Sequence, residues 1–389
     1  MIMEDMILDN VKNMPPSGIR KYFDMINEME DVISLGVGEP DFITPWNIRE
    51  AGIYSLEKGH THYSSNAGFI ELREEISKYL YRKVNLSYNP KTEILVTVGG
   101  SEAIDLALRA LVGPGDEVIV PEPSFVAYKG CTAFTGATSV VIDLKEENDF
   151  KLTKEELENA ITDKTKVLIL PFPNNPTGAI MTREELAPIV EVLKDKNIII
   201  LSDEIYSELS YDGNHVSIAS FDEVKDKTII VNGFSKAYAM TGWRLGYVVG
   251  HPVLVDAMKK IHQYAIMCSP TTSQYAAIEA LKNADDNVKQ MAREYNRRRR
   301  VITDGFRKMG LDCFDALGAL YVFPCIKSTG MTSDEFCEKL LLEEKVLAVP
   351  GSAFGDCGEG YIRACYAASM DDIMEAIKRI GRFVEKNKK

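Results

Sequence analysis

The chain lacks the features that mark membrane-spanning, secreted and nucleic-acid-binding proteins. Its apolar runs are all shorter than the roughly 20 residues that span a bilayer, and its first residues, MIMEDMILDN, place acids among the apolar side chains. We therefore expect no membrane span and no signal peptide. Cationic residues are outnumbered, with 45 Lys and Arg against 58 Asp and Glu and a formal net charge of −13. This excess of acid argues against nucleic acid or an anionic membrane as a partner.

Cysteine and histidine are also scarce. The 7 cysteines are scattered without a C-x-x-C pair, which indicates reduced thiols in a cytoplasmic protein rather than a disulfide framework. His60 and His62 lie close together in a predicted loop, but no third ligand is in reach, so we expect no metal site. The 389 residues, 45% hydrophobic and 26% charged, have an ordinary globular composition. They exceed one simple core and predict two domains.

One stretch, Asn232–Tyr247, carries the strongest chemical signal. Its lysine, Lys236, has apolar or small neighbours, so its ammonium would be poorly solvated and its pKa lowered. A neutral amine can attack a carbonyl and form a Schiff base. Arg244 offers a planar guanidinium suited to a phosphate, and Gly242 and Gly246 leave room for close backbone approach. The stretch therefore predicts a site for a phosphorylated aldehyde; a buried strand and turn with a surface lysine and arginine is the alternative.

A second stretch has the pattern of a phosphate cradle. A strand predicted over Ile94–Val98 runs into Gly99 and Gly100, and a helix continues over Ile104–Leu111. A strand, two glycines and the start of a helix would collect backbone N–H groups and the positive end of the helix at one point. The alternative is a tight strand-to-helix turn that binds nothing.

Two charged residues and one aromatic residue accompany apolar strands. Asp203 follows the strand predicted for Ile198–Leu201, and ligands of α/β sheets bind outside the carboxyl ends of strands. Arg363 lies within the apolar strand Tyr361–Cys365, where a guanidinium needs an anionic partner; a structural salt bridge is the alternative. Phe125 follows the two prolines of PEPSF and is either a flat surface for a ring or an ordinary core residue.

The string SKAYAMTGWRLGY, which begins at Ser235, resembles the lysine signature of the class I/II aminotransferases, the fold type I pyridoxal-phosphate enzymes. The other motifs follow in the family's order from Gly38 to Arg363. The resemblance implies an α/β fold with a large domain, built on a mostly parallel central sheet flanked by helices, and a smaller α+β domain. It also implies pyridoxal 5'-phosphate as cofactor, bound by Lys236. One departure is Gly233, where many members carry a serine, so a hydroxyl contact to the phosphate is expected to be missing.

The expected organisation is an N-terminal arm with part of the small domain over residues 1–45, the large cofactor-binding domain over 46–285 and the small C-terminal domain over 286–389. A short helix is expected at Ile19–Met29 in the arm. A long charged helix over Asn283–Met309 would carry the chain into the small domain. Its arginines Arg297–Arg300 are predicted to lie on a solvated face beside acids.

The resemblance assigns the cofactor's surroundings. The phosphate would lie among residues of the cradle and the lysine stretch, namely Gly100, Ser101, Glu102, Ser235 and Arg244. Phe125 would stack on the ring and Asp203 would pair with its protonated nitrogen, which keeps the ring able to accept electrons. Asn175, held in the rigid turn NNPTG, and Tyr206 would bond the phenolic oxygen.

The substrate and the partner subunit are assigned in the same way. Arg363 would grip the substrate carboxylate, beside Asn175 and the backbone of Gly38. Tyr63 would reach the phosphate of a neighbouring subunit, which implies a homodimer with shared active sites. The reaction implied is ping-pong transfer of an amino group between an L-amino acid and a 2-oxo acid, with Lys236 as the general base.

Other functions on the same scaffold stay open at this point. A carbon–sulfur β-lyase would share every residue named above. A non-catalytic regulator of the same fold would need an added DNA-binding domain, which we do not expect because too few residues precede Gly38 to form one. Members with these motifs act on aspartate, aromatic amino acids, alanine or lysine-pathway intermediates. An aspartate-type or broad aminotransferase is the expectation.

Overall fold

The structure, a computed structural model, describes residues 3–14 and 29–387. The helix predicted for Ile19–Met29 falls outside these ranges except for Met29, which lies in a loop. Among the described residues no helix combines the length and the apolar character needed to cross a bilayer.

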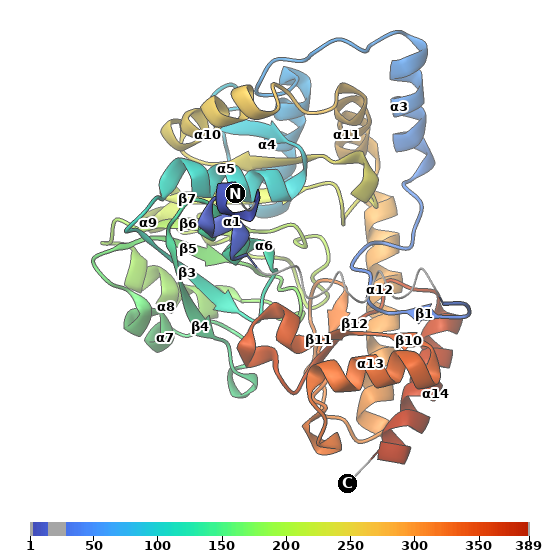
Figure 1. Ribbon diagram of the computed structural model, residues 1–389. Coiled ribbons are helices and arrows are strands. Elements are labelled where there is room, and N and C mark those ends of the chain that lie inside the picture. The colour runs from blue at the N-terminus through green and yellow to red at the C-terminus, as the bar shows by residue number, and fades with distance from the viewer. Residues whose placement is uncertain (1–2, 15–28, 388–389) are drawn as a thin grey trace.

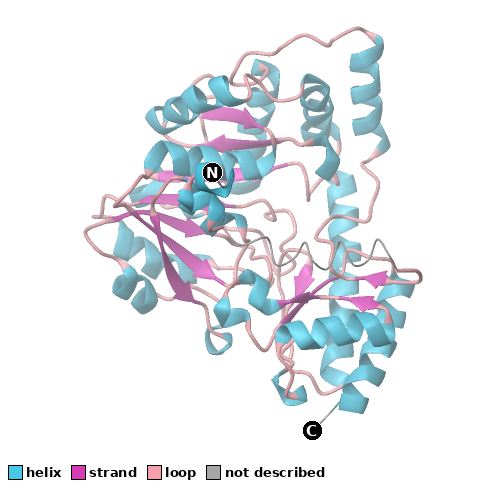
Figure 2. Cartoon of the chain, in the orientation of Figure 1, coloured by secondary structure: helices cyan, strands magenta, loops and turns pink. Residues whose placement is uncertain are grey.

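A seven-stranded sheet forms the centre of the larger part of the molecule (Figures 1 and 2). Its only antiparallel member among the described strands is β8, which pairs with both β2 and β7. The order across the sheet is β2 (Ile94–Thr97), β8 (Gly246–Val249), β7 (Thr228–Gly233), β6 (Ile199–Asp203), β5 (Thr165–Leu170), β3 (Glu117–Glu122) and β4 (Thr138–Asp143).

Helices cover both faces of this sheet, which explains why its central strands are apolar on both sides. Successive side chains of a strand point to opposite faces, so Val118 and Val120 pack in one cluster and Ile119 in another. One face is covered by α5 (Gly99–Leu111), α6 (Ala127–Phe134) and α10 (Pro252–Ala265). The other is covered by α4 (Ile70–Val84), α7 (Lys154–Ala160), α8 (Arg183–Leu193), α9 (Asp222–Lys225) and α11 (Thr271–Asn283).

The C-terminal layer is the second part of the molecule and lies beside the sheet (Figure 1). It contains the helices α12 (Asp285–Lys308), α13 (Ser333–Glu344) and α14 (Met370–Asn387). Its two small sheets pair β1 (Ile33–Ser34) with β10 (Val346–Leu347), and join β11 (Val349–Pro350), β12 (Ile362–Cys365) and β9 (Tyr321–Val322). Because β1 pairs with β10, a segment near the N-terminus completes the C-terminal layer.

The other helical elements of the described residues are α3 (Trp46–Glu57), which packs on α11, and a set of helices of only three or four residues. These short helices are η1 (Met3–Met6), α1 (Asp9–Lys12), η2 (Glu146–Asn148), η3 (Ile218–Ser220), η4 (Thr241–Trp243), η5 (Lys327–Thr329), η6 (Gly351–Phe354) and η7 (Asp356–Gly358).

Helix α12 connects the two parts. Val288, in its first turn, belongs to the apolar cluster of α4 and α11, whereas Met291 and Tyr295 belong to the cluster of the C-terminal layer. The predicted solvated face is wrong for Arg298 and Arg299, which are buried. Consecutive helical residues point in different directions around the axis, so four arginines in a row cannot share one face.

The two buried arginines have polar partners. The Arg298 guanidinium donates to both carboxylate oxygens of Asp41, at 2.8 and 2.9 Å, and to Glu294 at 3.0 Å. Arg299 donates to the Asn296 side-chain oxygen at 3.0 and 3.1 Å. The Asp41 contact fastens the loop that follows β1 to the domain-crossing helix α12.

Candidate functional site

A cavity of about 390 Å³ lies where the carboxyl ends of β5, β6 and β7 face the C-terminal layer. This position is where ligands of open α/β sheets bind. All the predicted site residues except Tyr63 and Glu102 line it: Gly38, Gly100, Ser101, Phe125, Asn175, Asp203, Tyr206, Ser235, Lys236, Arg244 and Arg363. The chain therefore brings together residues that are more than three hundred positions apart in the sequence.

Lys236 follows the end of β7 and points into the cavity. Its Nζ donates to the carbonyl oxygen of Gly38 at 2.6 Å and lies 5.9 Å from the centre of the Tyr206 ring. Burial lowers the pKa of Lys236 to about 8, and the positive charges of Arg363 and Arg244 act in the same direction. With a pKa of about 8, roughly a tenth of this amine is neutral at pH 7, and that fraction can act as a nucleophile.

Asp203, the last residue of β6, is buried at the carboxyl end of this strand, which pairs with β7. One carboxylate oxygen accepts from the Tyr128 hydroxyl at 2.7 Å and the other from the Ile205 N–H at 3.2 Å. Burial raises the pKa of Asp203 to about 6, although both hydrogen bonds and the charge of Lys236 oppose the shift. A cation in the cavity would favour the charged form of this carboxylate.

Tyr128 is a site residue that the sequence analysis missed. It lies in the first turn of α6, three residues after Phe125, and the two rings meet edge to face with centroids 5.7 Å apart. One short segment therefore supplies both the aromatic wall and the hydroxyl that orients Asp203. A second aromatic residue three positions after the predicted stacking residue was the available signal, because the turn that leads into α6, closed by the Tyr128 N–H and the Phe125 carbonyl, brings the two rings together.

Arg363 lies on β12, buried beneath the rings of Tyr321 and Phe354, whose centroids are 4.5 and 4.7 Å from its guanidinium carbon. It donates to the Asn175 side-chain oxygen at 3.0 Å and to the Gly36 carbonyl at 2.6 Å. Its Nε is buried and has no partner in residues 3–14 and 29–387. None of the partners found for this guanidinium among the described residues is a carboxylate, so its charge is uncompensated within that part of the chain.

Tyr321 is the second residue that the sequence analysis missed. Its hydroxyl is 2.7 Å from that of Tyr206 and 3.4 Å from the Gly38 carbonyl oxygen. A Cβ at position 38 would overlap the Tyr321 hydroxyl, which explains why Gly38 carries no side chain. The sequence gives no local signal for this contact, because Tyr321 comes from β9 of the C-terminal layer.

The predicted phosphate cradle and the lysine stretch meet at the N-terminus of α5. A Cβ at Gly99, whose φ is +78°, would lie 2.8 Å from a terminal nitrogen of Arg244. A Cβ at Gly246 would lie 2.7 to 2.8 Å from the backbone of Gly99 and Gly100. A side chain at Gly233 would meet the Gly246 Cα and the Leu245 carbonyl at 3.0 Å. Close pairing of β7 with β8 thus leaves little room for a side chain at position 233.

Glu102 and Tyr63 are the predicted residues that do not line the cavity. The Glu102 carboxylate accepts from the Val98 N–H and lies 2.7 Å from Nδ1 of the fully buried His262. Its side chain therefore fastens α5 to α10, while its backbone stays in the first turn of the helix. Tyr63 lies in the loop between α3 and α4 and is 78% exposed.

We expect Lys236 of the ligand-free protein to be acylated with a midpoint near pH 8, because burial lowers its pKa to about 8. A short peptide lysine, with a pKa of about 10.4, serves as the internal reference. Trace labelling with acetic anhydride between pH 6 and 11, followed by peptide mass spectrometry, gives both profiles. Since only the neutral amine reacts, a Lys236 profile that coincides with the reference would contradict the assigned burial effect.

Comparison with known proteins agrees with this geometry. Residues 30–380 match the family described as aminotransferase class I and II. A Bacillus subtilis protein named YugH, described as an aminotransferase without a stated substrate, is 50% identical and covers 99% of this chain and 100% of its own. The aspartate aminotransferase of Pyrococcus abyssi is 43% identical, with 98% of each chain covered.

A solved structure shows the same fold. The aspartate aminotransferase from Thermus thermophilus with maleate superposes with a TM-score of 0.92 at 34% identity, covering 97% of this chain and 99% of that one. The predicted fold class, an α/β fold with a mostly parallel central sheet, is confirmed. On the match of residues 30–380 and the likeness to these relatives, the chain belongs to the class I and II aminotransferase family.

Proposed function

We propose that this aminotransferase uses pyridoxal 5'-phosphate to move an amino group between an L-amino acid and a 2-oxo acid, with aspartate-type or broad specificity. One observation carries the proposal. A lysine amine with a lowered pKa, a buried aspartate and an arginine without a carboxylate partner among the described residues share one cavity. The specificity rests on relatives whose names include aspartate aminotransferase and, in Thermococcus litoralis, aromatic-amino-acid aminotransferase 2.

The residues of the cavity fit this cofactor. The neutral amine of Lys236 suits a covalent bond to an aldehyde. Asp203 is a buried carboxylate held by neutral donors, so a protonated ring nitrogen would supply the opposite charge that favours its ionised form. Phe125 lines the same cavity and offers a ring face for stacking. When bound, the cofactor supplies an electron sink for the substrate's Cα.

The phosphate would lie at the N-terminus of α5, where backbone N–H groups, the helix dipole and Arg244 meet. We assign its contacts to Gly100, Ser101, Glu102 through its backbone, Ser235 and Arg244. Asn175 and Tyr206 would donate to the phenolic oxygen, and Tyr206 would then exchange part of its contact with Tyr321 for the new one.

The substrate carboxylate would bind Arg363, whose fork can hold two oxygens, beside Asn175 and the Gly38 backbone. The unpartnered Nε of Arg363 is a donor available for that contact. The Lys236 amine, when it is not bound to the cofactor, would take the proton from the substrate's Cα and deliver it within the same site. Its pKa of about 8 suits both directions of proton transfer near neutral pH.

A homodimer completes the proposed site. Tyr63 and Tyr264 are 78% and 89% exposed, so both rings are available for contact with a partner subunit. We propose that Tyr63 reaches the phosphate of the partner subunit.

The domain division at residues 1–45, 46–285 and 286–389 is supported by the passage of α12 from one apolar cluster to the other. A cytoplasmic location is proposed from the scattered free cysteines.

The experiment that tests the function is a panel of amino donors and 2-oxo acid acceptors on purified holoenzyme, with 2-oxo acid formation as readout. We expect transfer from aspartate or from several donors, with the parallel double-reciprocal lines of ping-pong kinetics. The Lys236→Ala variant is the blank, since it removes the nucleophile and base. Turnover that survives in this variant would discard the assigned role of the lysine.

Replacing Arg363 by lysine should raise the KM for amino acids by about tenfold to a hundredfold, because lysine keeps the charge but loses the bidentate fork. Cofactor affinity, measured by absorbance titration, should change far less. Arg297→Lys is the matched control, because this exposed arginine lies on α12 away from the cavity. An unchanged KM for Arg363→Lys would remove Arg363 from the substrate site.

A further inference from the structure

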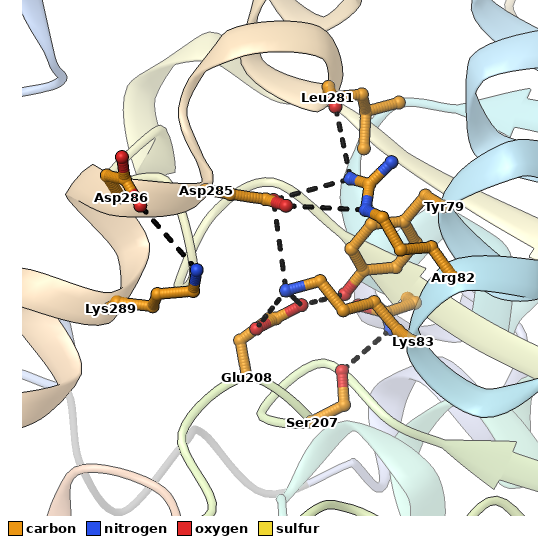
Figure 3. Close-up of polar contacts among 10 residues, drawn as sticks. Tyr79, Arg82, Lys83, Ser207, Glu208, Leu281, Asp285, Asp286 and Lys289 are labelled. Atoms are coloured by element: carbon orange, nitrogen blue, oxygen red, sulfur yellow. Dashed lines mark hydrogen bonds and ion pairs between the residues drawn. The ribbon is translucent and has the colours of Figure 1, made fainter.

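Ionic side chains from three segments of the chain meet close to the loop that follows Asp203 (Figure 3). Glu208, five residues beyond Asp203, accepts from the hydroxyl of Tyr79 at 2.7 Å. The Lys83 ammonium lies 3.0 and 3.1 Å from its two carboxylate oxygens. Tyr79 and Lys83 both belong to the last turns of α4. A second cavity, of about 120 Å³, adjoins this contact and is lined by Tyr79, Lys83 and Glu208 among others.

The same ammonium also faces the start of α12. Lys83 Nζ lies 3.8 Å from a carboxylate oxygen of Asp285, the first residue of that helix. Arg82 holds Asp285 with two contacts of 3.3 Å and donates to the Leu281 carbonyl at 3.2 Å. Figure 3 shows that Lys83 points between Glu208 and Asp285. Among the described residues, it is the cation that contacts both carboxylates.

Several residues of the segment that leads from Asp203 to Glu208 line the active-site cavity or contact residues near it. Asp203 and Tyr206 line the cavity, and the Tyr206 hydroxyl contacts Tyr321 of the C-terminal layer. Ser207 accepts from the Asn232 side chain of β7 at 3.1 Å, four residues before the reactive lysine. Displacement of Glu208 would therefore be transmitted to groups on both sides of the cavity.

Helix α12 turns a small change at its first residue into a larger one at the far end. Its 24 residues span about 36 Å at 1.5 Å per residue, so a tilt of about 5° at one end displaces the other by about 3 Å. The helix packs on α14 and contacts β9, and β9 pairs with β12, the strand of Arg363. The position of the Asp285 end therefore affects where Arg363 lies relative to Lys236.

Burial separates the Lys83–Glu208 pair from ordinary surface ion pairs. The Lys83 and Glu208 side chains are 23% and 14% exposed, so removing the cation would leave a largely buried carboxylate without its charge partner. A neighbouring pair, Lys289 with Asp286, is drawn in the same view (Figure 3). Its members are 58% and 100% exposed and 3.5 Å apart, and such pairs contribute little.

We propose that Lys83 is a positioning residue that couples the loop of Asp203 and Tyr206 to the N-terminal end of α12, and through it to Arg363. The inference rests on the proposed function, because it concerns how two groups of that site keep their separation. Lys83 does not line the cavity of that site; it acts through Glu208 and Asp285.

The test compares Lys83→Met, Lys83→Arg and Lys289→Met holoenzymes with the wild type. Two quantities are measured for each: kcat and KM for the amino donor, and hydrogen–deuterium exchange of the amides in residues 204–209 and 291–295, the latter lying beyond the unbonded first turn of α12. We expect Lys83→Met to raise KM about tenfold, with a smaller effect on kcat, and to speed exchange in both segments. Lys83→Arg, which keeps the cation, should restore both within about twofold. Lys289→Met should match the wild type.

Two results would overturn the proposal. Faster exchange with an unchanged KM would make Lys83 merely structural, and faster exchange in only one of the two segments would show that they are not coupled. Should Lys83→Met fail to fold, Asp285→Asn keeps the Lys83–Glu208 contact and weakens the contacts of both Lys83 and Arg82 with α12; it should raise KM more than Arg82→Met, which removes only the Arg82 contact. If the wild type itself transfers no amino group, the proposed function fails, while the exchange data still test the coupling.

Discussion

The burial of one amine is the constraint on which the site depends. Lys236 can be neutral near neutral pH only because its ammonium is kept from water, and that requires walls from separate parts of the chain. The end of β7 supplies one wall, and the Gly38 loop supplies another together with the carbonyl that accepts from Nζ. Tyr321, from β9, supports that loop from the far side. The C-terminal layer therefore helps to lower the pKa of Lys236, and it also carries Arg363.

Two buried charges of opposite sign flank this amine without neutralising each other. Asp203 is held by a tyrosine hydroxyl and a backbone N–H, and Arg363 by an amide oxygen and a carbonyl. Each is fixed in direction by neutral groups, so each keeps its capacity to attract a charge that arrives with a ligand. Such preorganised groups cost no reorganisation when the ligand binds. The separation between the acid and the arginine then has to be maintained across two parts of the molecule, which is the task we assign to α12 and the ionic contacts at its start.

Much of the fold and of the cavity's lining could be predicted because the signals are local. The capping box of Thr182 with Glu185 begins α8 as a helix-start pattern should, and the apolar strands form the central sheet. Contacts between distant segments left no such signal. Tyr321 reaches Tyr206 and Gly38 only because β9 folds against the large sheet, and Arg298 is buried because Asp41 meets it from a loop far away in the sequence. Glu102 was predicted from its place in the cradle, but its side chain turns to a histidine of α10. The assigned roles in cofactor and substrate binding remain predictions, since geometry alone does not test them.

The most direct test of the central claim is to trap the cofactor on the protein. Holoenzyme loaded with pyridoxal 5'-phosphate is reduced with borohydride, digested, and mapped by mass spectrometry for the added phosphopyridoxyl group. The buried, partly neutral amine predicts that the group is found on Lys236, in the peptide that carries the SKAYAM segment. Stoichiometric labelling of a different lysine, or a protein that carries no label after loading, would contradict the account.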